Sequence, residues 1–284
     1  MKMISSRQNP AFKVLRDLVG APRDRRAHGL AWCEGDRLAH TFAQAARDRP
    51  WFDRGGLILV ASSAPILEGL DPEWQAIFHE TWVLSPELFA EISQIETSPG
   101  WGLIVPAPLH DATVAGSNAS ASTPQTTAIA EDVVVLDRLQ DPGNVGAILR
   151  SAAAAGVTEV WNVSGSVDVW APKVVRSAMG AHAVLRLSAP MTQEQVIAAA
   201  QNRNIPLMAT GLGAHTVSLF SEALNLAPPL GWIFGQEADG VGAGLLSAAR
   251  RVTIPMAPTV ESLNVAAAAS ICLFETMRRR GQRR

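Results

Sequence analysis

Apolar runs alternate with amphipathic periodic segments along most of the chain. Residues 6–18 (SRQNPAFKVLRDL) and the valine after them place Phe12, Leu15 and Val19 at helical spacing with basic residues between, which predicts a basic amphipathic helix. An arginine-rich segment follows, which is expected to be a polar turn. Later strands are expected at 31–35, 56–63, 82–85 and 102–108, and helices at 36–49 and 86–94. This order predicts a small α/β domain over residues 1–110.

A second alternating series follows a segment of different composition. Residues 111–130 are rich in Ala, Ser and Thr and lack apolar periodicity, which is typical of a linker. The continuous apolar run in EDVVVLDRL then suits a strand that is covered on both faces. Further strands are expected at 160–163, 184–188, 206–211, 231–235 and 251–256. With helices between them, residues 131–284 are predicted to form an α/β domain whose parallel sheet carries helices on both faces.

Charge is unevenly distributed along the chain, although the net charge is only -2. Residues 1–54 carry eleven Lys/Arg against six Asp/Glu, residues 55–137 carry none against eleven, and residues 138–284 carry thirteen against nine. Exposed charges more than about 10 Å apart are largely screened, so a segregated basic surface can attract phosphates despite the total. Solvated helix faces are the alternative explanation.

Several classes of protein are disfavoured by what the sequence lacks. Cys33 and Cys272 match no metal or redox spacing, which indicates buried thiols in a reducing compartment. The six histidines have no metal-ligand spacing, so no metal is expected. No run approaches the about 20 apolar residues of a membrane span, and the start of the sequence does not resemble a signal peptide. We therefore expect a cytoplasmic protein without a membrane partner.

Three junctions between a strand and a helix carry candidate chemistry, because open α/β sheets bind ligands at the carboxyl ends of their strands. In the first, residues 141–144 form a turn and helix start. Asn144 there is suited to cap the helix or to bind a partner, and Arg150 projects from the helix. A capped helix with a solvated arginine is the simpler alternative.

The other two junctions lie nearer the carboxyl end. In residues 232–244, a strand ends at Gly235 and Glu237 follows before a Gly-rich helix entry, so a ligand could touch the main chain there. A plain tight turn is the alternative. In residues 253–275, Ser262 is expected to start a helix, and the small residues 266–270 permit close backbone packing. Ordinary core packing would require the same small residues.

Together the three junctions resemble the SpoU/TrmH branch of the knotted RNA methyltransferases. The matching residues are Asn144, Gly146 and Arg150 in the first junction, Gly235 and Glu237 in the second, and Ile254, Pro255, Ser262, Leu263 and Asn264 in the third. Segments 6–18 and 29–38 resemble the start of the substrate-binding domain of rRNA-modifying members. Ala238 stands where members often have glycine, and Ser98-Pro99-Gly100 stands where relatives often show Thr-Pro-Gln-Gly.

The resemblance implies a trefoil knot in the sheet domain and methylation of a ribose 2'-hydroxyl with S-adenosyl-L-methionine. The implied cofactor-binding residues are Gly211, Gly235, Ile254 and Leu263. The implied catalytic residues are Arg150, Asn144, Glu237, Ser262 and Asn264. In this reading Arg150 grips phosphate and stabilises the developing alkoxide, Asn144 orients Arg150, and Glu237 pairs with Arg150 or positions substrate. Ser262 and Asn264 complete a polar wall.

The implied partners are RNA, with rRNA preferred over tRNA, and a second copy of the chain that supplies the arginine. Two alternatives stay open, a tRNA 2'-O-methyltransferase and a catalytically silent RNA-binding member. A nicotinamide dehydrogenase is disfavoured, because Gly211-Leu212-Gly213 lacks the third glycine and the later acidic residue of that fingerprint. No P-loop sequence occurs.

Overall fold

A computed structural model describes residues 1–48, 57–70, 77–113, 132–211 and 215–281. Contacts within the chain divide it into two units. The first consists of Met1–Pro108 and Trp170–Ala183, and the second of Leu109–Val169 and Val184–Arg284. Segment 170–183 thus clusters with the first unit, although it lies within the catalytic domain predicted from the sequence. Most of the predicted linker at 111–130 lies outside the described residues.

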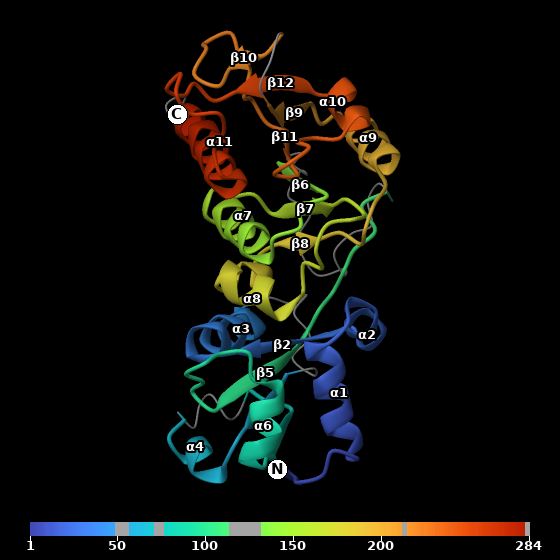
Figure 1. Cartoon of the computed structure of the whole chain (residues 1–284), viewed down its shortest axis with the longest axis vertical. Helices are drawn as coiled ribbons and strands as arrows, with labels where there is room; N and C mark the ends of the chain where they lie inside the picture. The colour runs from blue at the N-terminus through green and yellow to red at the C-terminus, as the bar shows by residue number, and fades with distance from the viewer. Residues whose placement is uncertain (49–56, 71–76, 114–131, 212–214, 282–284) are drawn as a thin grey trace. The chain divides into compact units, whose positions relative to one another are not determined.

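The first unit contains a mixed sheet with strand order β1-β4-β3-β5-β2. Its strands are β1 (Lys2–Ile4), β2 (Leu30–Glu34), β3 (Ile58–Ala61), β4 (Glu80–Leu84) and β5 (Trp101–Pro106). Its helices are α1 (Pro10–Val19), α2 (Pro22–His28), α3 (Asp36–Asp48), α4 (Ala64–Glu68), α6 (Pro86–Ile92) and α8 (Pro172–Ala178), with a short 3-10 helix at Ala181–Ala183. Helices α1 and α6 lie along one face (Figure 1). Phe12, Leu15 and Phe89 of these helices belong to one buried cluster with Trp32 and Trp82 of the sheet.

The arginine-rich segment after α1 is a helix, so the predicted polar turn is wrong. Pro22 occupies the first turn of α2, and Gly29 ends the helix in a left-handed conformation with φ 63°. Arg25 is only 3% exposed, and its guanidinium donates to the carbonyls of Leu18 (3.0 Å) and Gly20 (2.7 Å). A charged residue thus supplies the buried face of a helix whose sequence shows no apolar periodicity.

The second unit contains a sheet with strand order β10-β12-β9-β11-β6-β7-β8, in which all neighbouring strands are parallel. Its strands are β6 (Val133–Asp137), β7 (Glu159–Asn162), β8 (Arg186–Leu187), β9 (Leu207–Thr210), β10 (Val217–Ser218), β11 (Gly231–Gly235) and β12 (Arg250–Thr253). Its helices are α7 (Pro142–Ala154), α9 (Gln193–Asn202), α10 (Ala243–Ala248) and α11 (Val265–Gly281). The predicted parallel α/β architecture is confirmed.

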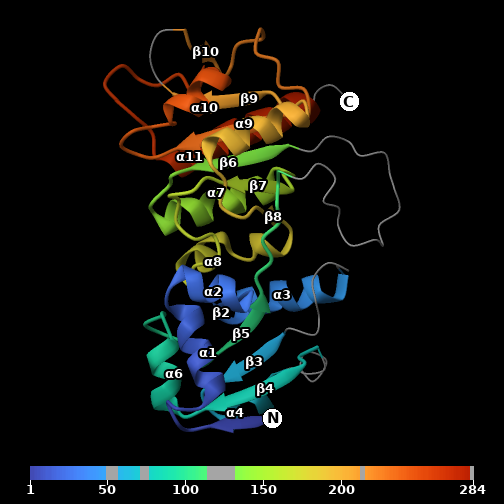
Figure 2. The same ribbon diagram turned by 90° about the vertical axis from the view of Figure 1, so that its right-hand side faces the viewer.

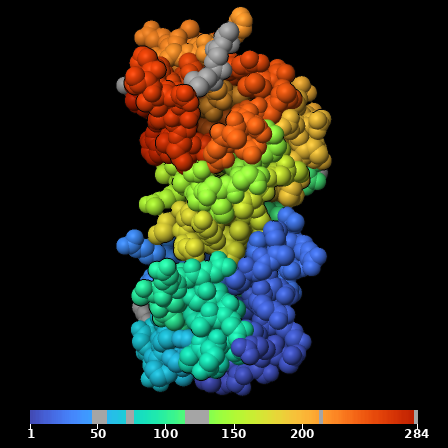
Figure 3. All heavy atoms as spheres, in the orientation of Figure 1, coloured from blue at the N-terminus to red at the C-terminus, as the bar shows by residue number. Residues whose placement is uncertain are grey.

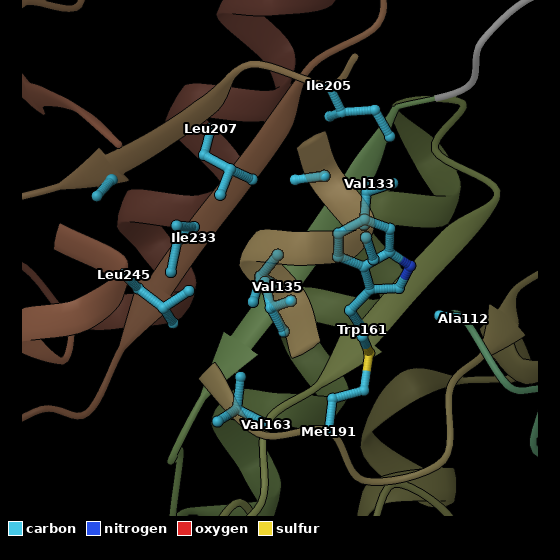
Figure 4. Packing of buried hydrophobic residues seen from close by; sticks show 14 of the residues in the cluster. Ala112, Val133, Val135, Trp161, Val163, Met191, Ile205, Leu207, Ile233 and Leu245 are labelled. Atoms are coloured by element: carbon cyan, nitrogen blue, oxygen red, sulfur yellow. The ribbon is translucent and has the colours of Figure 1, made fainter. Parts of the chain in front are cut away.

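Both faces of this sheet are covered by helices. Val133 and Val135 of β6 face α9 and α10 in a core that includes Trp161 and Leu245 (Figure 4). Helices α7 and α11 lie together over the opposite face, as Figures 1 and 2 show. The hydroxyls of Ser151 (α7) and Ser270 (α11) lie 2.8 Å apart, so the small residues predicted to allow close packing do so here.

Helix α11 begins at Val265 and not at Ser262, so that predicted start is wrong. The Asn264 side-chain oxygen accepts from the amides of Ala266 (2.9 Å) and Ala267 (3.2 Å), which caps the helix. Cys33 and Cys272 are buried as expected, and burial raises the pKa of both thiols. Within the described residues, no helix is long and apolar enough to cross a membrane.

Glu275 holds the end of α11. Its carboxylate accepts from Arg278 and Arg279 at 2.7 Å each, and Arg279 also donates to the carbonyls of Leu219 and Ser221. The Arg278 hydrogen bond is the largest cause that lowers the pKa of Glu275 to about 2. A lowered carboxyl pKa stabilises the fold above the ordinary value, and that stabilisation is lost as pH falls.

We expect Glu275→Gln to lower the melting temperature at pH 7 by about 2–4 °C, which corresponds to about 1 kcal/mol in a unit of this size. The difference from wild type should narrow as pH is lowered from about 5 towards 2. Scanning calorimetry over this range measures it, with Glu222→Gln as an exposed control. A difference that is independent of pH would contradict the role of the Glu275 charge.

Candidate active site

The carboxyl ends of neighbouring parallel strands bring the three junctions together. Gly235 is the last residue of β11 and lies in register with Asp137, the last residue of β6. Gly211 follows β9 and Ile254 follows β12, and these two strands continue the same sheet beyond β11. The predicted cofactor residues Gly211, Gly235 and Ile254 therefore lie along one sheet edge, the edge at which open α/β sheets bind ligands.

Asn144 connects all three junctions through its side chain. The Asp141 carboxylate caps α7 by accepting from the Asn144 amide at 2.7 Å, so the Asn144 side chain is not needed as the cap. Its Nδ2 donates to Glu237 Oε1 at 2.7 Å, and its Oδ1 accepts from Asn264 Nδ2 at 3.0 Å. The Asn144 side chain is therefore not the cap of α7, and it bonds to two other residues of the candidate site.

Asn264 joins the site to helix α11. Its Oδ1 caps the helix, while its Nδ2 donates to Asn144. The amide of one residue therefore fixes both the first turn of α11 and the polar cluster. A helix that started at Ser262 would not place this amide at the helix end.

Glu237 lies on a tight turn that follows β11. The Gly240 amide donates to the Gln236 carbonyl at 2.8 Å, and these two residues form an isolated antiparallel bridge. A Cβ on Gly235 would lie 2.3 Å from the carbonyl carbon of Gly240, so only glycine allows the turn to fold back over the strand end. The Glu237 side chain is exposed and thus open to a ligand.

Arg150 and Ser262 lie outside the hydrogen-bonded polar cluster of the site. Arg150 lies further along α7 and is exposed, and no residue of the described chain forms a hydrogen bond or ion pair with its guanidinium. Asn144 is bonded to Glu237 and Asn264, so the expected orientation of Arg150 by Asn144 and its pairing with Glu237 are not seen within one chain. Ser262 is exposed in the loop before α11.

Three polar residues beside the cluster were missed by sequence analysis. Asp137 is completely buried at the end of β6, and Arg138 and Gln193 both donate to its carboxylate. The available signal was an acidic residue at the end of a continuous apolar run. Within the described part of the chain, no group of three or more His, Cys, Asp or Glu residues could hold a metal ion.

Comparisons with known proteins show which family this chain resembles. The sequence model of the SpoU rRNA Methylase family matches residues 131–274. A protein of Synechocystis sp. named as a tRNA/rRNA methyltransferase is 31% identical over 277 residues, which cover 97% of this chain and 93% of that protein. The 23S rRNA (guanosine(2553)-2'-O)-methyltransferase RlmP of Bacillus subtilis is 28% identical and covers 96% of this chain and 98% of its own.

The fold is also that of a solved methyltransferase structure. The AdoMet-bound rRNA methyltransferase from Sinorhizobium meliloti superposes with a TM-score of 0.77 at 24% identity, over 98% of each chain. The family match and the similarity of the Synechocystis protein both extend over the residues of the polar cluster. This chain belongs to the SpoU rRNA methylase family.

Proposed function

We propose that this chain transfers the methyl group of S-adenosylmethionine to a ribose 2'-hydroxyl of ribosomal RNA. The observation that carries the proposal is the Asn144 bridge, which gathers Glu237 and Asn264 from two distant segments at the sheet edge. The name of Bacillus subtilis RlmP supports a 2'-hydroxyl of rRNA as the target, and its similarity spans both units. On the same ground rRNA is preferred over tRNA.

The residues at this edge fit the cofactor. A Cβ on Gly211 would meet no atom within 4 Å, so the main chain there is open to a ligand. Leu263 is 38% exposed and Ile254 is partly exposed, which provides apolar surface for an adenine ring beside free backbone groups. With Gly235, these residues would hold S-adenosylmethionine, whose sulfonium supplies an electrophilic methyl group.

The side chains of the cluster position the substrate. Transfer requires the attacking oxygen to lie in line with the methyl group and to lose its proton. An arginine side chain stays protonated in proteins, so Arg150 acts by gripping phosphate and stabilising the negative charge on the attacking oxygen. Asn144 holds Glu237 at 2.7 Å, and the exposed carboxylate of Glu237 orients the ribose.

A second copy of the chain would complete the site. On α11, Phe274 is 41% exposed and Met277 is 45% exposed, and Leu263 lies exposed before the helix. Figure 3 shows α11, in red, on the outside of the second unit. Exposed apolar side chains on one helix are typical of a subunit interface. We include in the proposal a homodimer built on α11, with Arg150 acting on the partner's substrate.

Two further features belong to the same proposal. The chain between β11 and α11 is proposed to form the trefoil knot implied by the family, which would bring the segment around Ile254 and Leu263 next to Gly235. Action on ribosomal RNA would place the enzyme in the cytoplasm.

The proposal that Arg150 contacts the substrate and not the cofactor can be tested by mutation. Arg150→Ala should abolish methyl transfer, because the guanidinium contacts substrate, while leaving S-adenosylmethionine affinity within a few fold. Methylation of total rRNA with labelled cofactor and titration calorimetry measure the two quantities. The same two quantities are measured for Ser262→Ala, which alters another exposed residue of the candidate site. Equal losses of activity and cofactor affinity in Arg150→Ala would indicate a structural role instead.

The basic surface of the first unit is proposed to bind RNA, and the structure shows which of its basic residues are exposed. Among the basic residues of the amino-terminal segment, Arg25 is buried, and Arg7 and Arg23 form ion pairs with Glu91 and Asp24. The exposed basic residues of α1 and α2 are Lys13, Arg16, Arg23 and Arg26. Their replacement by glutamine should weaken RNA binding and flatten its salt dependence by about one log-log unit for each phosphate that the protein no longer neutralises.

Filter-binding titrations at several salt concentrations measure this slope. Arg25→Gln is the matched control, because it should lower the melting temperature and leave the slope unchanged in the folded fraction. An unchanged slope in the variant with all four exposed residues replaced would remove α1 and α2 from the RNA-binding surface.

The shared site can be tested with mixed dimers. Arg150→Ala is combined with a second inactive variant that blocks the cofactor, and Gly211→Phe suits this because the space around Gly211 is open. A large residue at Gly235 would instead displace the turn that carries Glu237. After dissociation and reassociation, each heterodimer should contain one intact site and regain methyl transfer. A fully active monomer in sedimentation, or no recovery in proven heterodimers, would refute the shared site.

A further inference from the structure

A buried carboxylate at the end of the central strand has no part in the chemistry described above. Asp137 is the last residue of β6 and has no exposed surface. A buried charge is costly unless hydrogen bonds and an opposite charge compensate for the missing hydration. The partners of Asp137 therefore indicate which part of the fold it serves.

These partners come from the turn that follows β11 and from two neighbouring side chains. The Gly242 amide donates to Asp137 Oδ2 at 2.6 Å. Arg138 Nε donates to Oδ1 at 3.2 Å, and Gln193 Nε2 donates to Oδ1 at 3.3 Å. Gly242 lies at the base of the turn that carries Glu237, so the carboxylate is bonded directly to that turn.

Arg138 holds the other side of the same turn base. Its Nη2 donates to the Gly240 carbonyl at 3.4 Å while the guanidinium pairs with Asp137. Arg138 has a left-handed backbone with φ 58°, which is unfavourable for a residue with a side chain. The Gln140 side chain donates to the Arg138 carbonyl at 3.1 Å and supports this conformation.

The turn packs closely against the end of β11 and against Gln193. A Cβ on Gly235 would lie 2.3 Å from the Val241 amide nitrogen, and a Cβ on Gly242 would lie 2.0 Å from Gln193 Nε2. The turn is thus packed onto the strand end below and against Gln193 at its side. Glu237 projects from it and accepts from Asn144 at 2.7 Å.

We propose that Asp137 is a positioning residue for methyl transfer, which acts with Arg138 and Gln193 to fix turn 236–242 and so to hold Glu237 against Asn144. The inference rests on the proposed function, because it assigns Glu237 a role in that reaction. Asp137 contacts neither substrate nor cofactor in this arrangement. Its effect on the rate passes through the position of Glu237.

Asp137→Asn tests the proposal with little change in shape. The substitution replaces one carboxylate oxygen with an NH2 donor and removes the charge, so the side chain can no longer accept from the Gly242 amide and from Arg138 and Gln193 together. We expect kcat at saturating RNA and cofactor to fall about tenfold to a hundredfold, with a smaller change in the KM for RNA. Gln193→Ala, at the edge of the same contact, should lower kcat less and keep the fold.

Asp132→Asn is a matched control at the opposite end of β6. Asp132 also accepts a backbone amide, from Leu230 at 2.9 Å, and also pairs with an arginine, Arg280. The variant therefore loses the same kinds of interaction without touching the turn. Its melting temperature should fall, and its kcat should stay within about twofold of wild type. An equal kcat loss in both variants would overturn the proposal.

A double-mutant cycle separates positioning from general destabilisation. If Asp137 acts through Glu237, then Asp137→Asn should change the rate less than about twofold when Glu237 is already glutamine. Full additivity of the two losses would show that Asp137 affects the reaction by another route and would refute the positioning role.

Hydrogen exchange provides a readout that needs no activity. Amides of residues 236–242 should exchange faster in Asp137→Asn than in wild type or in Asp132→Asn, because the base of the turn no longer has its acceptor. Unchanged exchange in this segment would overturn the inference even if the enzyme is active. Absence of methyl transfer in the wild-type protein would count against the proposed function instead, and the exchange experiment would still decide whether Asp137 fixes the turn.

Discussion

The parallel pairing of β6 with β11 is the constraint on which the rest of the site depends. Its register sets Gly235 opposite Asp137, so both strands end at the same level of the sheet. The helix that follows β6 and the turn that follows β11 must then start side by side. This is how Asn144 and Glu237, which are 93 residues apart in sequence, come within hydrogen-bond distance. A slip of this pairing by one residue would separate them and invert the faces of β6.

The polar cluster is also part of the helix framework. Asn264 caps α11 with its oxygen and bonds to Asn144 with its nitrogen, while Asp141 caps α7 next to Asn144. Helices α7 and α11 pack closely enough for Ser151 and Ser270 to share a hydrogen bond. Because the starts of both helices meet at Asn144, packing between the helices and alignment of the site are coupled.

The parallel α/β architecture could be predicted from the sequence, since buried parallel strands and their helices leave strong periodic signals. Helix α2 could not, because its buried residue is Arg25, whose charge is satisfied by carbonyls that only the fold brings near. The start of α11 was misplaced because serine and asparagine both cap helices, and the bonds from the Ala266 and Ala267 amides to Asn264 identify the cap only in the structure. The structure brings residues of the three predicted junctions together, and the hydrogen bonds among them depend on tertiary register.

The Arg150 side chain differs from the rest of the site in its contacts, and this difference indicates what it binds. Each of Asn144, Glu237 and Asn264 has its side chain fixed by a neighbour, and Arg150 is held by none of the described residues of its own chain. A long, unpaired guanidinium loses considerable rotamer entropy when it is fixed in one position. Strong contacts must offset that loss at the moment of reaction, and an RNA phosphate offers the bidentate, charge-assisted geometry that does so. Substrate would therefore assemble the last element of the site, while the rigid polar cluster exists beforehand.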